Sequence, residues 1–220
     1  MSSGEQAHRV RDGVRTALPL ALGPLLFGLS FGVLADAAGI GAVAATVMSA
    51  TTFAGSAQFG AVTVLDAGGT VVAAIMAAVF LNARYVAISV TVASIFPGGR
   101  TRRLVESQLI VDESWALSGR SGRFEWSILV GSGLLLYVLW VASTAVGTVL
   151  GDALGDPNGL GLDAAFAALF LTLLAPYLRG RRAIQAAALA AGITLVLTPV
   201  TPAGVPIVAA AAACLIGLKR

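Results

Sequence analysis

The sequence predicts an all-α, polytopic integral membrane protein of about six to seven transmembrane helices, with a re-entrant or broken segment at residues 41–66. Of its 220 residues, 57% are hydrophobic and 11% are charged, whereas a soluble domain has about 25% charged residues. The hydrophobic residues fall in long runs, which short basic or glycine- and proline-rich stretches separate. The net charge of +3 comes from short clusters without interleaved aromatic residues, so it indicates membrane topology and not nucleic-acid binding.

The chain divides into a polar cytoplasmic N-terminal tail, residues 1–15, and a single transmembrane domain, residues 16–220. The tail lacks a small-residue cleavage signature, so we expect it to be retained. The first apolar run, Thr16 to Asp36, holds Gly28 and Gly32 at the GxxxG spacing that lets two helices approach closely.

The second run, Gly41 to Leu65, has a polar centre at Phe53 to Phe59, with the sequence FAGSAQF. A hydroxyl, an amide and a glycine are not expected in a helix that faces lipid, because the hydrocarbon core holds no water that could hydrogen-bond unpaired polar groups. The centre therefore indicates either tight helix packing or a lined cavity. The third run, Thr70 to Phe96, is long enough to span a bilayer with some tilt.

Residues 100–125 form a long polar segment with five arginines and four acids. Within it, Leu104 to Leu117 shows a rough helical amphipathicity, so we predict an interfacial helix on the cytoplasmic side. Ser127 to Leu150 is a clear span. The last apolar runs, whose lengths are near the lower limit for spans, are residues 162–178, 183–198 and 205–218.

The positive-inside rule places both termini in the cytoplasm, together with the basic loops at residues 100–123 and 179–182. Three apolar runs separate the N-terminus from the first loop, and an odd number of crossings cannot connect two points on one side. One run therefore fails to cross. We favour residues 41–65, because non-helical backbone at membrane depth is tolerated where protein or a water-filled cavity covers it. Alternatively residues 104–117 cross, which would bury acids at about 2.5–3.5 kcal/mol each.

Arg84 lies near the middle of the third run, too far from either end to snorkel easily, and its planar fork suits a substrate carboxylate. A structural ion pair or a carbonyl clamp at a helix kink is the alternative. Asn82 beside it, with Gly55, Ser56 and Gln58 of the polar centre, completes the candidate substrate-binding set. Ser56 and Gln58 could equally form hydrogen bonds between closely packed helices.

Three acids are candidates for proton coupling. Asp112 and Glu113 are adjacent carboxylates at the predicted membrane interface, an arrangement suited to holding a proton. A solvated helix face is the alternative for this pair. Asp163, at the start of a later run, is either a proton carrier or an acid that favours a helix N-terminus.

Several strings, in order along the chain, resemble the AzlC family, also called BrnF, the larger subunit of the branched-chain amino acid exporters. They are FAGSAQF at Phe53 to Phe59, LNARY at Leu81 to Tyr85, DESWAL at Asp112 to Leu117, Tyr137 with Trp140, and GLD at Gly161 to Asp163. The match runs from Thr16 to the C-terminus. The family pattern usually has a histidine where this chain has Tyr85. A direct role of a histidine at this position therefore does not carry over to this chain.

The resemblance implies export of valine, leucine and isoleucine across the cell inner membrane, driven by the proton-motive force. It also implies a small membrane protein of the AzlD (BrnE) type as partner, and we expect no cofactor and no metal. A zwitterionic apolar amino acid needs a group for its carboxylate, one for its ammonium and an apolar pocket. Arg84, Gln58 with backbone carbonyls, and small apolar walls would supply these.

Other function classes are less well supported by the residues. An intramembrane enzyme is disfavoured because the one histidine, His8, lies in the tail, and the chain has no HExxH motif. The single cysteine, Cys214, allows neither an intrachain disulfide nor a CxxC metal site. The alternative to an exporter is a passive channel or a structural membrane subunit, whose flux would not respond to a proton gradient.

Overall fold

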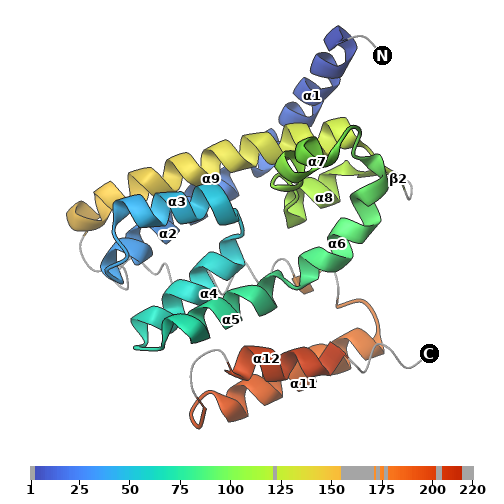
Figure 1. The fold of residues 1–220 in the computed structure, drawn as a ribbon. Helices are drawn as coiled ribbons and strands as arrows, with labels where there is room; N and C mark the ends of the chain where they lie inside the picture. The colour runs from blue at the N-terminus through green and yellow to red at the C-terminus, as the bar shows by residue number, and fades with distance from the viewer. Residues whose placement is uncertain are drawn as a thin grey trace. The chain divides into compact units, whose positions relative to one another are not determined.

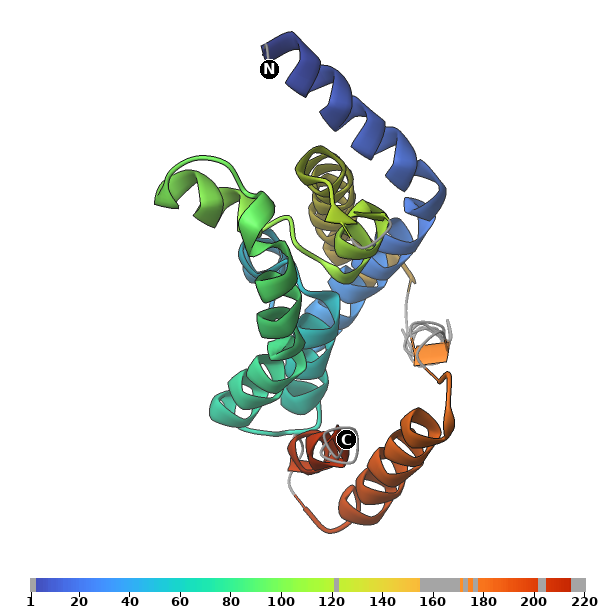
Figure 2. The same ribbon diagram turned by 90° about the vertical axis from the view of Figure 1, so that its right-hand side faces the viewer.

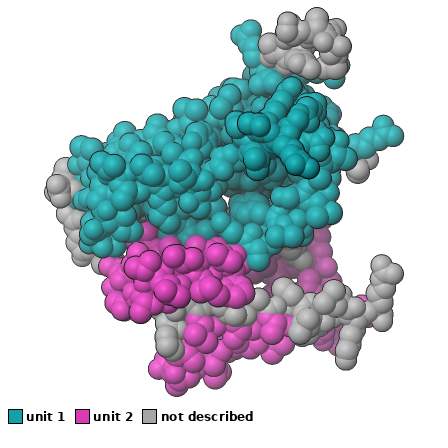
Figure 3. Space-filling view, in the orientation of Figure 1, with its two compact units in different colours: residues 1–58, 82–154 teal, residues 59–81, 155–220 magenta. Residues whose placement is uncertain are grey.

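The computed structural model describes residues 3–120, 123–154, 171, 174–175, 178–201 and 205–214. In this part of the chain the structure is mostly helical, which confirms the all-α class (Figure 1). The chain divides into two compact units, Met1–Gln58 with Asn82–Leu154, and Phe59–Leu81 with Gly155–Arg220 (Figure 3). The candidate functional residues that the structure describes belong to the first unit.

The described elements follow one another along the chain in this order. They are α1 (Ser3–Ala17), η1 (Leu18–Leu20), α2 (Leu22–Ala37), α3 (Ala42–Thr52), α4 (Gly55–Asp66), α5 (Val71–Asn82), α6 (Arg84–Val92), η2 (Ala93–Ile95), α7 (Arg100–Ser107), α8 (Asp112–Ser118), β1 (Gly119–Arg120), β2 (Arg123–Phe124), α9 (Trp126–Leu154), α11 (Arg181–Leu197), α12 (Val205–Ala211) and η5 (Ala212–Cys214). The two short strands pair antiparallel, with Gly119 opposite Phe124.

Helix α9 is the element around which the first unit packs, and α2 lies alongside it (Figures 1 and 2). The GxxxG prediction is confirmed, because Gly28 and Gly32 both face α9. A Cβ at Gly32 would overlap the carbonyl oxygen of Thr144, and one at Gly147 would overlap that of Leu29. Phe31 stacks on the indole of Trp140 with ring centroids 6.3 Å apart. The small residues thus bring the two backbones into direct contact.

The polar N-terminal segment forms a helix. Residues 3–17 make up α1, which packs against the first turns of α9. A Cβ at Gly13 would lie 2.8 Å from the carbonyl oxygens of Ser127 and Ile128, so this contact is also a close backbone approach. The tail expected at residues 1–15 is therefore an ordered part of the first unit over the residues described.

The second apolar run is broken at its polar centre, as the sequence suggested. Helix α3 ends at Thr52 and α4 begins at Gly55. Between them Phe53 adopts a left-handed backbone with φ 40° and ψ 52°, a conformation that L side chains rarely take. Its ring packs edge-on against Tyr137 of α9 at 5.1 Å, which helps to hold this strained residue in place.

The amphipathic segment is also broken, and here the prediction of one helix over Leu104 to Leu117 is wrong. Helices α7 and α8 are separated by the non-helical residues 108–111. Val111 is extended, with φ −127° and ψ 168°. The Ser114 hydroxyl accepts a hydrogen bond from Val111 N–H at 3.0 Å and donates one to the Leu109 carbonyl at 2.7 Å. These bonds satisfy the backbone at the break, which contains neither glycine nor proline.

Two described helical stretches are long and apolar enough to cross a membrane, Val71–Ile95 and Trp126–Gly151. They correspond to the third predicted run and to the clear span at Ser127 to Leu150. A third is possible if Arg9–Leu20 and Leu22–Ala37, bent by 67°, act as one span. The total of six to seven spans stays a prediction.

The described helices of the second unit's C-terminal part are α11 and α12, which pack against each other (Figure 2). They correspond to the predicted runs at residues 183–198 and 205–218. Most of the run at residues 162–178 lies outside the described residues.

Candidate functional site

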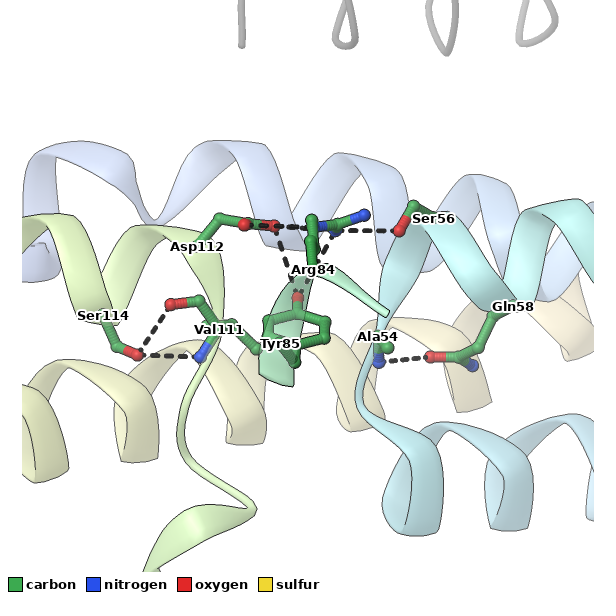
Figure 4. A network of polar contacts seen from close by, with 8 residues as sticks. All are labelled: Ala54, Ser56, Gln58, Arg84, Tyr85, Val111, Asp112 and Ser114. Carbon is green, nitrogen blue, oxygen red and sulfur yellow. Dashed lines mark hydrogen bonds and ion pairs between the residues drawn. The ribbon is translucent and has the colours of Figure 1, made fainter. Parts of the chain in front are cut away.

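Arg84 forms a bidentate ion pair with Asp112, which comes from a different helix (Figure 4). Arg84 Nη2 lies 2.8 Å from Asp112 Oδ2, and Nε lies 3.2 Å from Oδ1. Arg84 is the first residue of α6 and sits near the middle of the candidate span Val71–Ile95. Asp112 is the first residue of α8. The break before α8 therefore brings a carboxylate to the middle of a membrane-length helix, where an unpaired guanidinium would be costly.

Two further hydroxyl groups contact this pair. Arg84 Nη2 donates to Ser56 Oγ at 2.9 Å, and the Tyr85 hydroxyl donates to Asp112 Oδ2 at 3.3 Å. The Arg84 guanidinium also lies over the Tyr85 ring, 4.9 Å from its centroid. Ser56 belongs to the first turn of α4, so the cluster joins the start of α4, α6 and α8. Each of these helices begins directly after an interruption in a longer helical run.

Gln58 lies in a separate network, which ties the α3–α4 break to α9. Its Oε1 accepts hydrogen bonds from Ala54 N–H at 3.3 Å and from Trp140 Nε1 at 3.1 Å. Its Nε2 donates to Ser49 Oγ at 2.8 Å, and Ser49 Oγ lies 2.9 Å from Thr144 Oγ1. Gln58, Ser49 and Thr144 are fully buried. The network supports the alternative that Gln58 bonds between packed helices.

The carbonyls at the end of α3 are satisfied by side chains from other elements. The Tyr137 hydroxyl donates to the Ala50 carbonyl at 2.8 Å, and Gln108 Nε2 donates to the Thr51 carbonyl at 2.6 Å. Unpaired carbonyls at a helix end need such partners where water is absent. Gln108 lies in the α7–α8 break, so this bond connects that break to the last turn of α3.

Gly55 and Asn82 flank the ion-pair cluster along the chain. A Cβ at Gly55 would lie 2.8 Å from Cη2 of Trp140, so only glycine lets α4 start this close to the indole. Asn82 Oδ1 is buried and has no hydrogen-bond partner within the part of the chain that the structure describes. A buried acceptor left in this way is available to a donor from a bound solute.

Glu113 follows Asp112 on α8, outside the membrane-length helices. Burial raises the pKa of Glu113 above its ordinary value, and the neighbouring charge of Asp112 adds to the increase. A carboxyl group in this environment holds a proton more readily than an exposed one.

In the structure Arg84 contacts both Ser56 and Asp112 directly, and Glu113 follows Asp112 in the chain. It places Gln58 in the neighbouring network. Asp163 lies outside the described residues. Tyr85 was missed as a site residue, although its position directly after a mid-span arginine was a signal that it could share the same polar surroundings.

Comparisons with known proteins show that the chain is similar to membrane proteins. A family model described as AzlC protein matches residues 19–154. An uncharacterized membrane protein of Archaeoglobus fulgidus is 31% identical over 219 residues, which cover 97% of this chain and 95% of that protein.

Two other relatives are more distant. The branched-chain amino acid transport protein AzlC of Bacillus subtilis is 25% identical over 171 residues, which cover 74% of this chain and 65% of that protein. An uncharacterized membrane protein of Haemophilus influenzae is 27% identical over 189 residues, covering 82% and 75%. No solved structure matches the chain.

Proposed function

This chain belongs to the AzlC family, and on that premise we propose that it exports valine, leucine and isoleucine, driven by the proton-motive force. A membrane transport role is supported by the family match and by the Bacillus subtilis relative, which is named as a branched-chain amino acid transport protein. The direction of transport, its driving force and the cargo of this chain are parts of the proposal.

The observation that carries the proposal is the Arg84–Asp112 pair at the meeting point of three helix starts. Transporters characteristically bind their substrates where discontinuous helices meet near the middle of the membrane. A guanidinium there favours an anionic group such as the α-carboxylate of an amino acid. A helix that only faces lipid would not retain this cluster.

The residues have distinct roles in this proposal. Arg84 binds the substrate carboxylate, Ser56 offers it a further polar contact, and Asn82 Oδ1 offers an acceptor to a donor group on the substrate. Gly55 and Gln58 do not bind the substrate in this proposal and instead position the site, because they fix the start of α4 against α9. The remaining acids, Asp112, Glu113 and Asp163, are proposed to couple transport to protons, and the raised pKa of Glu113 suits this task.

The proposal extends to the assembly and its place in the cell. The chain acts as the large subunit of a two-component permease in the inner membrane, together with a small AzlD-type membrane protein. Both termini lie in the cytoplasm, as the distribution of arginines indicates.

Export can be tested in cells loaded with a dipeptide that contains leucine. Cells that make the chain with its presumed partner should hold less internal leucine than cells that lack both. Arg84→Lys should lose most of this effect, because an ammonium group cannot reproduce the bidentate fork. Equal retention with and without the two proteins, when both are present in the membrane, would reject the exporter. Flux that ignores an imposed proton gradient would favour a passive channel.

A further inference from the structure

We infer that Asp112 binds the ammonium group of the substrate, so that the Arg84–Asp112 ion pair opens to receive both charges of an α-amino acid zwitterion. The inference rests on the proposed function, since it assigns the second charged subsite of the same transport site. It makes Asp112 a substrate-binding residue in addition to a candidate for proton coupling.

The pair has the charges that a zwitterion requires. An α-amino acid carries a carboxylate and an ammonium group on one carbon atom, and the site holds a guanidinium and a carboxylate in direct contact at 2.8 Å. The Arg84 side chain is 34% exposed and that of Asp112 is 28% exposed, so neither charged group is enclosed inside the protein. Substrate binding then replaces one contact between opposite charges with two.

Both members of the pair retain a partner when they separate. Arg84 Nη2 also donates to Ser56 Oγ, and Asp112 Oδ2 also accepts from the Tyr85 hydroxyl. Neither charge would be left without a hydrogen bond during the exchange. The same second partners hold the guanidinium and the carboxylate in place for the incoming ligand.

Gln58, which the sequence suggested for the ammonium group, has no remaining capacity for it. Its amide oxygen already accepts from Ala54 and Trp140, and the side chain is fully buried. A carboxylate is also the stronger partner for an ammonium group, because both are charged. Among the described residues near Arg84, Asp112 fits this role by charge and by distance.

The assignment predicts which ligands the site rejects. In the empty site the two charges neutralise each other, and with a zwitterion bound each is paired again. A ligand with only one charge would leave either Arg84 or Asp112 unpaired, which is strongly unfavourable at this depth. We therefore expect the keto acid of leucine and isoamylamine, which lack one charge each, to bind more than about 100-fold more weakly than leucine.

The test is equilibrium binding of labelled leucine, and separately of its keto acid, to the full-length chain purified together with its AzlD-type partner in lipid nanodiscs. Wild type should bind leucine and bind the keto acid more than about 100-fold more weakly. Asp112→Asn removes the partner of the ammonium group, so leucine binding should fall by a similar factor. It also removes the carboxylate that the keto acid leaves unpaired, so keto acid binding should improve at least about tenfold. Asp66→Asn, at an exposed position at the end of α4, is the matched control and should change neither.

Three results would decide against the inference. Wild type that binds the keto acid as well as leucine would overturn the ammonium site even if Asp112→Asn does not fold. An Asp112→Asn variant that folds and keeps leucine affinity would overturn it too. A wild-type chain that binds none of valine, leucine and isoleucine would overturn the proposed function itself and this inference with it.

Discussion

The hydrogen bonds of Gln58 allow a quantitative prediction about the helix break. In Gln58→Leu the side chain keeps its bulk but loses three hydrogen bonds, to Ser49, Ala54 and Trp140. Side-chain hydrogen bonds within membrane proteins are worth about 0.6–1.7 kcal/mol each, so the free energy of unfolding should fall by about 2–5 kcal/mol. Because the network holds the start of α4 against α9, the break should loosen and transport should fall as well.

The measurement is reversible unfolding of the purified chain in mixed micelles with increasing SDS, followed by the helical circular dichroism signal. The matched control is Gln185→Leu, at an exposed position on α11, where a change within about 0.5 kcal/mol is expected. If Gln58→Leu is as stable as this control, the network does not hold the break. If stability is unchanged but leucine affinity is lost, Gln58 contacts the substrate directly.

Two further variants test neighbouring features. Gly55→Ala places a Cβ 2.8 Å from the Trp140 ring, which its bond to Gln58 holds in place, so stability should fall by about 1–3 kcal/mol. The added Cβ in Gly192→Ala meets nothing within 4 Å and should not destabilise the chain. Both variants are compared by thermal unfolding, and equal melting temperatures would contradict the contact of Gly55 with Trp140. The raised pKa of Glu113 means that the folded chain binds a proton at this carboxyl group more tightly than the unfolded chain does. Protonated Glu113 therefore stabilises the fold at low pH, and this stabilisation is lost as pH rises through that pKa. Glu113→Gln should therefore match wild type in acid and exceed its stability at neutral pH, and parallel pH profiles would refute this.

The sequence identified the helical class and the break in the second run, and it marked Arg84 as a candidate site residue. The break was visible because FAGSAQF combines a glycine with polar side chains where a lipid-facing helix has none. Arg84 was visible because a charge in the middle of an apolar run needs a partner. These signals are local in the chain, and a single sequence is sufficient to show them.

The partners of these residues could not be derived from the sequence. Arg84 and Asp112 lie 28 positions apart, with an irregular connection between them. The break before Asp112 has no glycine or proline, and the Ser114 hydroxyl bonds to its backbone at Val111 N–H and at the Leu109 carbonyl. The pairing itself follows a general rule, that a charge at membrane depth is paired. Applied to Arg84, that rule would have directed attention to the acids of the polar segment.

Modification of a cysteine at position 56 tests most directly whether the cluster around Arg84 is the transport site. Ser56→Cys is made in a chain with Cys214→Ala, and its reaction with a small thiol reagent is followed with and without leucine. The control is a cysteine at Leu104, which is 72% exposed on α7, outside the membrane-length helices. We predict that leucine slows modification at position 56 and leaves the rate at position 104 unchanged. Equal rates at position 56 with and without leucine, in a variant that still transports leucine, would show that the substrate binds elsewhere.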